Sequence, residues 1–414
     1  MELMNQPLTG QLGDRIVELL ESDEFHTLNI IVAFAKNSGV LRIKEALKRF
    51  KEKGGVVNIY VGIDLGGTSY EALTALLLHT DSLNVVHAEK SQTFHSKIYQ
   101  FSGKHKEIIV VGSHNLTGGG LWTNFESSVH LTLDASIAEE VPVLNRLNEH
   151  IQELNSLEDS FKSIDTQDDI EQLLQNGYVF KEVAERVRWA KSAKQRESHK
   201  SLFGKGVPAK LPRITTPKKV KTAAAPKKAK SVAPPTEPTP FPSSEQGQTI
   251  WFETRKMTGG SRNILDLSMR SLVESGSPEG TQFDLGEKKF MRGGVGFFGM
   301  RPEETNQSKD ITLNFEGLDY QGNTIKFPDG DNANGTWRLQ IKGVNSNGDK
   351  ITEILKAKGE GDYLVEKIVT FTKVEGDYYF MSVYPETELE NFKAASNILA
   401  RNGASKMARL LGVL

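Results

Sequence analysis

A basic, proline-rich segment divides the chain into two parts. Residues 191–240 contain thirteen Lys or Arg against two Asp or Glu, a net charge of +11, and eight of the fifteen prolines. The segment has almost no large apolar side chains, so it cannot bury enough surface to offset its ordering entropy. Proline and like charges both favour extension, which predicts an extended linker over 191–245. This linker serves either as a solvated spacer or as a spacer that also contacts phosphates.

Two domains are expected on either side of the linker, over 1–190 and 246–414, each long enough for its own core. The sequence has no cysteine, which excludes disulfides, thiolate metal sites and cysteine nucleophiles. It has no run of 18 or more apolar residues, so we expect no membrane span. The N-terminus lacks the pattern of a signal peptide. We therefore expect a soluble, cytoplasmic protein that does not act at a membrane.

Strand and helix patterns alternate in the N-terminal part. Strands are expected near 28–34, 56–61, 83–87, 94–101, 107–112 and 126–133, helices over 14–20, 40–50 and 70–78, and mostly helix over 135–190. Alternation of this kind predicts an α/β domain, a mixed sheet with helices on both faces. After the linker, short strand patterns at 249–254, 310–315, 336–341 and 363–371 are separated by turns rich in Gly, Asn and Asp, and a helix is expected at 386–400. This second pattern predicts a β-rich barrel or sandwich.

One short stretch places histidine and lysine at strand spacing. His95 and Lys97 are two residues apart, and side chains at i and i+2 share one face of a strand. All nine histidines lie at or before His199, so histidine chemistry belongs to the N-terminal part. A lone His-x-Lys is more often a core histidine beside a lysine that reaches solvent. The pair therefore needs support from a second motif.

The following strand supplies that second motif at its glycine-bounded end. Ser113 and Asn115 share a side there, where backbone can approach a ligand closely, and Glu126 begins the next strand. This combination suits phosphoryl transfer. His95 can attack phosphorus, while Lys97 and Asn115 can donate to the phosphate oxygens. Glu126 could accept a hydrogen bond from the other imidazole nitrogen and so determine its tautomer.

Competing motifs are weaker. Residues 63–68, Ile-Asp-Leu-Gly-Gly-Thr, resemble the phosphate loop of sugar kinases of the actin-like fold. That loop should open its domain and lead into a hairpin, whereas here it comes second and leads into a helix. A turn near the active site is the better interpretation. His105, His114 and His130 lack metal-ligand spacing, so no metal site is expected. No Walker-type motif is present, so this chain alone should not hydrolyse ATP.

His95-x-Lys97, Gly112-Ser113-x-Asn115 and the later Glu126 resemble the signature of the phospholipase D superfamily, over about residues 25–135. One departure is Ser102, where the family often has an acidic residue. The resemblance implies a covalent phosphohistidine, with a second histidine protonating the leaving oxygen. The chain has a single copy of the motif, so the second histidine must come from a homodimer partner. The resemblance also implies cleavage without a cofactor or divalent metal.

Two polar loops of the C-terminal part carry residue types that read bases. They hold Arg255, Lys256, Ser261, Arg262 and Asn263 in the first loop, and Asn332, Asn334, Trp337 and Arg338 in the second. Arginine pairs with guanine and asparagine with adenine in the major groove, so these residues are candidate contacts to double-stranded DNA. The alternative is that both loops are ordinary hairpins, in which Asn, Asp and Gly are turn formers.

Residues 251–268 resemble the start of the DNA-binding pseudobarrel of plant transcription factors of the B-three type. A phospholipase D-like nuclease followed by this barrel is the layout of restriction endonucleases of the BfiI, NgoAVII and CglI type. The resemblance implies a sequence-specific restriction endonuclease subunit. Some relatives act with an ATP-dependent, helicase-like subunit, which is a possible partner here. The alternatives are a phospholipase D-type lipid phosphodiesterase and a DNA-binding protein that does not cleave.

Overall fold

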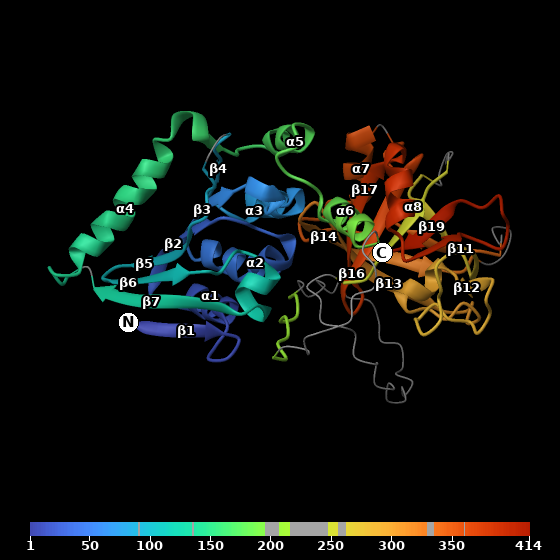
Figure 1. Ribbon diagram of the computed structural model, residues 1–414, viewed down its shortest axis with the longest axis horizontal. Coiled ribbons are helices and arrows are strands. Elements are labelled where there is room, and N and C mark those ends of the chain that lie inside the picture. Colours follow the sequence, from blue (N-terminus) through green and yellow to red (C-terminus); the bar gives the residue numbers. More distant parts are fainter. Residues whose placement is uncertain are drawn as a thin grey trace.

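The computed structural model describes residues 1–89, 92–134, 136–194, 207–215, 247–255, 262–328, 335–359 and 361–414. Figure 1 shows two halves side by side, the N-terminal one in blue to green and the C-terminal one in yellow to red. Each half is built on one large sheet. The expected fold class, an α/β domain followed by a β-rich domain, is therefore confirmed. None of the described helices is both long enough and apolar enough to span a bilayer.

The N-terminal sheet is mixed. Its strands occur in the order β1 (Glu2–Gln6), β7 (Glu126–Asp134), β6 (Lys106–Gly112), β5 (Lys97–Gly103), β2 (Phe25–Val32), β3 (Val56–Gly62), β4 (Ser82–Val86) and β8 (Phe161–Ser163). β2, β3 and β4 are parallel to one another, and the other neighbours are antiparallel. The parallel strands are mainly apolar, because both of their faces are covered. Each also contains one asparagine with a hydrogen-bond partner, Asn29, Asn58 or Asn84.

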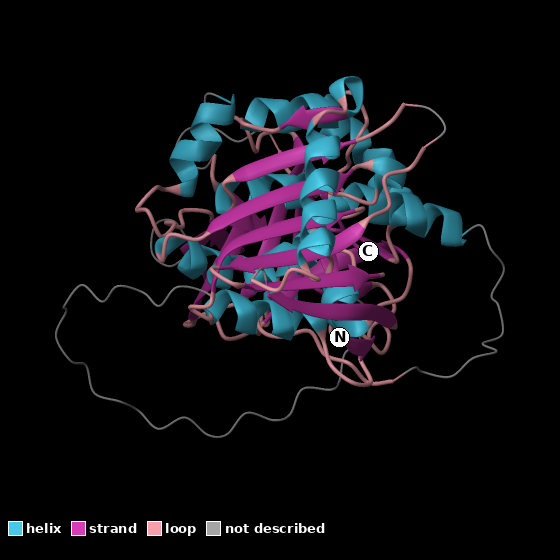
Figure 2. Cartoon of the chain, turned by 90° about the vertical axis from the view of Figure 1, so that its left-hand side faces the viewer, coloured by secondary structure: helices cyan, strands magenta, loops and turns pink. Residues whose placement is uncertain are grey.

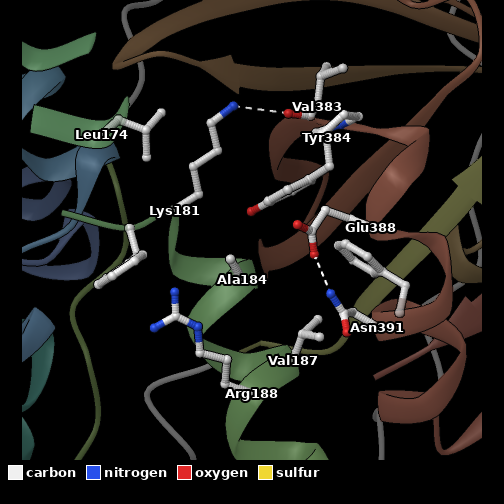
Figure 3. Close-up of a pocket in the computed structure, with 12 residues that line it drawn as sticks. Leu174, Lys181, Ala184, Val187, Arg188, Val383, Tyr384, Glu388 and Asn391 are labelled. Carbon is white, nitrogen blue, oxygen red and sulfur yellow. Dashed lines mark hydrogen bonds between the residues drawn. The ribbon is translucent and has the colours of Figure 1, made fainter. Parts of the chain in front are cut away.

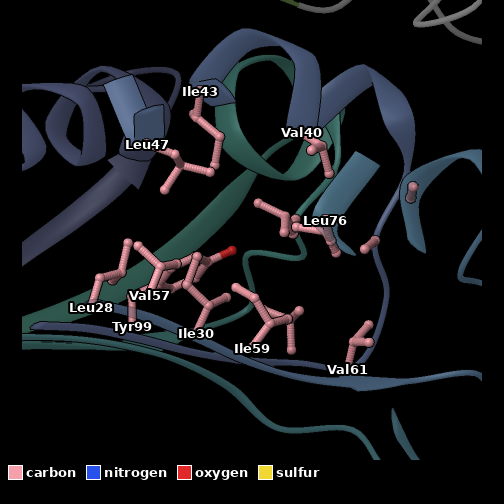
Figure 4. Close-up of a cluster of buried hydrophobic side chains, with 14 of the residues drawn as sticks. Leu28, Ile30, Val40, Ile43, Leu47, Val57, Ile59, Val61, Leu76 and Tyr99 are labelled. Atoms are coloured by element: carbon pink, nitrogen blue, oxygen red, sulfur yellow. The ribbon is translucent and has the colours of Figure 1, made fainter. Parts of the chain in front are cut away.

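Helices cover both faces of this sheet. On one face lie α1 (Leu12–Glu21), α2 (Asn37–Glu52), α3 (Tyr70–His79) and α5 (Gln167–Gln175), which form one apolar core with the strands. Figure 4 shows part of this core, where Ile43 and Leu47 of α2 face Leu28 and Ile30 of β2. On the other face α4 (Val141–Asn155) crosses the strands, as Figure 2 shows.

The C-terminal sheet surrounds a second core. Its strands occur in the order β10 (Ile264–Leu267), β15 (Trp337–Gln340), β14 (Leu318–Lys326), β13 (Ser308–Phe315), β17 (Tyr378–Pro385), β16 (Lys367–Glu375), β9 (Thr249–Glu253), β19 (Leu410–Val413), β18 (Ile398–Arg401), β11 (Arg270–Ser275) and β12 (Phe290–Arg292). Two helices, α7 (Ile351–Gly359) and α8 (Leu389–Ala395), accompany it. The core contains several phenylalanines, including Phe297, Phe298 and Phe371.

The two halves meet through α6 (Glu182–Lys194) and buried polar pairs. Val187 of α6 packs with Trp251 and Phe392 of the C-terminal half. Lys44 of α2 forms an ion pair of 2.5 Å with Asp319, and both side chains are buried. A cavity of about 390 Å³ lies at this junction (Figure 3). Its lining includes Lys181, Arg188, Tyr384 and Asn391 and no residue of the predicted catalytic group.

Several element predictions need correction. The strand expected from residue 94 begins at Lys97, and the strand expected over 363–371 begins at Lys367. The helix expected over 386–400 ends at Ala395, and residues 398–401 form a strand. Residues 161–163 form an edge strand in a region expected to be mostly helical. The strand β8 pairs with β4, which is distant in sequence, so local patterns carry little signal for it.

Candidate active site

His95 and Lys97 meet at the exposed start of β5. The Nζ atom of Lys97 lies 2.9 Å from Nδ1 of His95 and donates to the His95 carbonyl oxygen at 2.8 Å. Lys97 pairs with Val32 of β2, and its side chain is largely buried. His95 precedes the strand and is exposed. The expected contact between imidazole and ammonium is therefore present, although His95 itself lies outside the strand.

Burial changes the proton chemistry of this pair. Burial lowers the pKa of the Lys97 amine, and the nearby Glu126 carboxylate raises it by a smaller amount. A neutral amine can accept a hydrogen bond, whereas an ammonium only donates. When Lys97 is neutral, it accepts the Nδ1 proton of His95, and Nε2 keeps a free lone pair. When Lys97 is charged, it donates to Nδ1, and Nε2 carries the proton. The pair can thus present either a nucleophile or an acid.

The end of β6 brings the second motif to the same place. The Asn115 side-chain oxygen accepts a hydrogen bond from the backbone N–H of Phe34 at 3.2 Å. The Phe34 ring in turn packs edge-on against the His95 ring, with centroids 5.8 Å apart. The Asn115 oxygen is thereby used as an acceptor, which leaves its amide nitrogen as the donor. Phe34, which follows the end of β2, therefore contacts both Asn115 and His95.

Glu126 has a different partner from the one expected. Instead of accepting from His95, its Oε2 atom accepts a hydrogen bond from the Ser113 hydroxyl. Its Oε1 atom accepts from the Asn124 amide at 3.3 Å. Glu126 still acts on the site through its charge, since it raises the pKa of Lys97. Within this chain the contact to Nδ1 of His95 comes from Lys97 and not from Glu126.

His114 lies between Ser113 and Asn115 in the sequence, and its side chain is buried. One ring nitrogen, Nδ1, lies 2.8 Å from the Gly120 carbonyl oxygen, and Nε2 lies 3.0 Å from the Ser128 hydroxyl. Ser128 is also 3.0 Å from Nε2 of His130. Burial is the main cause that lowers the pKa of both histidines. The sequence suggested these histidines only as metal ligands, whereas in the structure they form hydrogen-bond contacts that connect β7 with the segment after β6.

Ser102 replaces the acidic residue that the phospholipase D resemblance expects. Its hydroxyl donates to Glu107 at 2.7 Å, and Glu107 lies directly opposite it on β6. Gln100 donates to the same carboxylate at 3.2 Å. Burial raises the pKa of Glu107, and these donors oppose that effect. A carboxylate is thus present beside β5, supplied by the neighbouring strand.

The predicted DNA-reading residues fall into three groups. Lys256, Ser261, Asn332 and Asn334 lie outside the described residues. Arg255 forms an ion pair with Asp266 at 2.7 Å, and Arg338 approaches the same carboxylate at 4.0 Å. The two predicted loops are therefore joined at one surface carboxylate.

The remaining three predicted residues have structural partners. Arg262 forms an ion pair with Asp362 at 3.1 Å. The backbone oxygen of Asn263 accepts from Ile341 at 2.9 Å. Trp337 is fully buried, and its ring nitrogen donates to the Pro302 oxygen at 3.1 Å. Trp337 is therefore a core residue in this structure and does not face DNA.

No family model and no curated protein matches the chain. Solved structures that match include Nuc from Salmonella typhimurium, described as a phospholipase D family member, at 16% identity over 40% of this chain and 97% of that chain, with a TM-score of 0.29. NucT from Helicobacter pylori matches at 16% identity over 39% and 98%, with a TM-score of 0.27. Phosphatidylserine synthase from Haemophilus influenzae matches at 12% identity over 47% and 46%, with a TM-score of 0.31.

Proposed function

We propose that this chain is the cleaving subunit of a sequence-specific restriction endonuclease that hydrolyses DNA phosphodiester bonds. One observation carries the proposal. Nδ1 of an exposed histidine, His95, lies 2.9 Å from the amine of a buried lysine, Lys97, beside the polar end of β6. We infer that Lys97 sets the protonation of Nε2, the ring nitrogen that it does not contact. Nucleophilic attack on phosphorus needs such a nitrogen.

The proposed reaction has two steps. Nε2 of one His95 attacks phosphorus, and the bond from phosphorus to the leaving oxygen breaks. That oxygen takes a proton from Nε2 of a second His95, whose Nδ1 takes a proton from the ammonium of its own Lys97. Water then attacks the phosphohistidine and gives a proton to Nε2 of the second His95, the Nδ1 proton returns to Lys97, and the bond between nitrogen and phosphorus breaks. Lys97 and the Asn115 amide supply donors where negative charge develops on the phosphoryl oxygens. Both histidines end in their starting states.

The second His95 belongs to a second copy of the chain in this proposal, because the sequence contains one His-x-Lys. An apolar row beside the site supports a homodimer. Val111 lies opposite Val129, which lies opposite Leu3, so the three share one face of the sheet. Val111 and Leu3 are 45% and 61% exposed, and Phe125, next to Glu126, is 66% exposed. Burying these side chains against a second copy would contribute favourable free energy.

Positive charge for the reaction comes from the His95–Lys97 pair that keeps its proton, so we propose cleavage without a divalent metal or other cofactor. ATP enters only through a possible helicase-like partner. The C-terminal half would bind double-stranded DNA. Arg255 and Arg338 are held on one surface carboxylate, Asp266, and are therefore oriented together. Oriented arginines are suited to bidentate contacts with guanine.

The experiment measures phosphodiester hydrolysis by the full chain in EDTA, on plasmid DNA and on bis(p-nitrophenyl) phosphate. The small substrate tests the chemistry independently of DNA recognition or a partner subunit. We expect hydrolysis that survives chelation and is lost in His95→Ala. The control is His150→Ala, an α4 histidine outside the site. Strict dependence on magnesium would contradict the mechanism, turnover of phosphatidylcholine would favour the lipid phosphodiesterase, and binding without cutting would favour the non-cleaving alternative.

A further inference from the structure

The turn that follows β3 supports the segment that carries His95. The Asp64 side chain in this turn is 9% exposed. Its Oδ2 atom accepts a hydrogen bond from the backbone N–H of Phe94 at 2.8 Å. Its Oδ1 atom lies 2.7 Å from Nδ1 of His87. A carboxylate only accepts, so His87 carries a proton on Nδ1 and donates it. Asp64 thus connects His87, which follows β4, with the residue before His95.

This connection matters because the sheet does not hold His95. β5 begins at Lys97, and residues 92–96 lie outside any strand. The backbone around His95 is instead held by the bond from Phe94 to Asp64 and by the bond from the Lys97 amine to the His95 carbonyl, 2.8 Å long. A nucleophile displaced by about 1 Å can lose about 100-fold in rate. The Asp64 carboxylate is therefore well placed to control the rate.

His87 is itself held in place. Its backbone N–H donates to the Ser160 oxygen at 3.0 Å, and its ring packs edge-on against Tyr178 with centroids 5.4 Å apart. If the His87 donor is removed, one oxygen of a buried carboxylate loses its partner. An unpaired buried acceptor is unfavourable, so the carboxylate would turn toward water and release the Phe94 N–H.

The same turn also supports the His95 ring. A Cβ atom at Gly67 would lie 2.0 Å from the Phe34 ring, so only glycine leaves room for that ring. Phe34 packs edge-on against His95, with centroids 5.8 Å apart. The glycine turn of residues 63–68, which resembled a phosphate loop in the sequence, therefore has a supporting role at the site.

We propose that Asp64 and His87 form a positioning pair that orients His95 for attack on phosphorus. The inference rests on the proposed phosphodiesterase function. Neither residue contacts the substrate in this proposal. His87 fixes the Asp64 carboxylate, Asp64 fixes the Phe94 backbone, and the backbone places His95 against Lys97.

The test compares His87→Phe with His87→Asn in the full chain. Phenylalanine keeps a ring against Tyr178 but cannot donate, whereas the asparagine amide can replace the Nδ1 donor. We expect His87→Phe to lower the single-turnover rate of bis(p-nitrophenyl) phosphate hydrolysis about 10- to 100-fold, by analogy with the loss of outer partners at metal sites. KM should change less than about twofold, since no substrate contact is lost. His87→Asn should recover most of the rate. His150→Phe, which removes a histidine 3.8 Å from Glu153, is the matched control.

A second measurement does not require activity. Amide hydrogen exchange at Phe94 should speed up at least 10-fold in His87→Phe and remain slow in His87→Asn and His150→Phe. A wild-type rate in His87→Phe, or equal losses in both His87 variants, would overturn the positioning role. If the wild-type chain hydrolyses nothing, the proposed function fails. The exchange rate at Phe94 then still decides whether His87 holds this backbone, and an unchanged rate would overturn the inference.

Discussion

Nζ of Lys97 lies 2.9 Å from Nδ1 of His95, so a buried amine is the hydrogen-bond partner of an exposed imidazole. This relationship connects the fold to the proposed chemistry. Lys97 pairs with Val32 of β2, and its side chain is buried there. Burial there lowers the lysine pKa, and a lower pKa makes proton sharing with His95 easier.

The pH dependence of cleavage should report this pair. In the proposed dimer one His95–Lys97 pair must lose a proton and the other must keep one, so we expect a bell-shaped rate profile whose pKa values belong to both pairs together. Glu126 raises the pKa of Lys97, so Glu126→Gln should shift the bell-shaped rate profile toward lower pH. Single-turnover pH profiles measure this, with Glu149→Gln on α4 as control. A shift toward higher pH would contradict the prediction.

Dimerisation should depend on the apolar row beside the site. Val111→Lys places a charge on a face that we propose is buried between two copies, which should weaken the dimer at least 10-fold and make activity depend on protein concentration. Val143→Lys on α4 is the matched control, since Val111 and Val143 are both 45% exposed. Sedimentation equilibrium measures the dimer. Equal behaviour of the two variants would show that this row is not the interface.

Acid should destabilise the fold partly through His79. Burial is the main cause that lowers its pKa from 6.5 to about 4, and the Lys44 charge adds to the effect. Because the folded-state pKa lies below the unfolded one, the unfolded chain binds the proton first. Stability is therefore full above pH 6.5 and falls by up to about 3 kcal/mol as the pH drops to about 4.

Urea unfolding at pH 7 and 4.5 tests the His79 prediction. His79→Leu should lose less stability than the wild type between these two pH values, because the titrating group is gone. His150→Leu, a substitution of a more exposed histidine on α4, should behave as the wild type does. The same loss of stability in wild type and His79→Leu would contradict the assignment.

DNA recognition should depend on the two arginines that meet at Asp266. Arg255→Ala and Arg338→Ala should each weaken binding to the recognition sequence by about 1–3 kcal/mol if they read bases. Binding to random DNA should change much less. Arg301→Ala, which removes an exposed arginine paired with Glu304, is the control. Equal weakening on specific and random DNA would identify phosphate contacts in place of base contacts.

Much of the fold class could be predicted because alternating strand and helix periods depend on short-range patterns. The contact between His95 and Lys97 was also expected, but on strand spacing, and His95 lies before the strand begins at Lys97. Trp337 shows a signal that was present and was misinterpreted. Trp337 and Leu339 are two apart on one strand, both are fully buried, and that alternation identifies an inward face.

The supporting contacts could not be predicted from such patterns. Asp64 is 30 residues from Phe94 and 23 from His87, and no local period connects them. Partners such as Asp64 depend on how distant segments align, which tertiary packing determines. Glu107, by contrast, is five residues from Ser102, and the register of the hairpin formed by β5 and β6 places the two opposite each other.

In the proposed mechanism His95 forms a covalent bond to phosphorus during cleavage. Mass spectrometry of the full chain, quenched during DNA cleavage in EDTA and then digested by a protease, measures this bond. We expect a nucleotide phosphate adduct on the peptide that contains His95, present during turnover and absent in His95→Ala. Efficient cleavage in EDTA with no adduct on His95 at any time would contradict it.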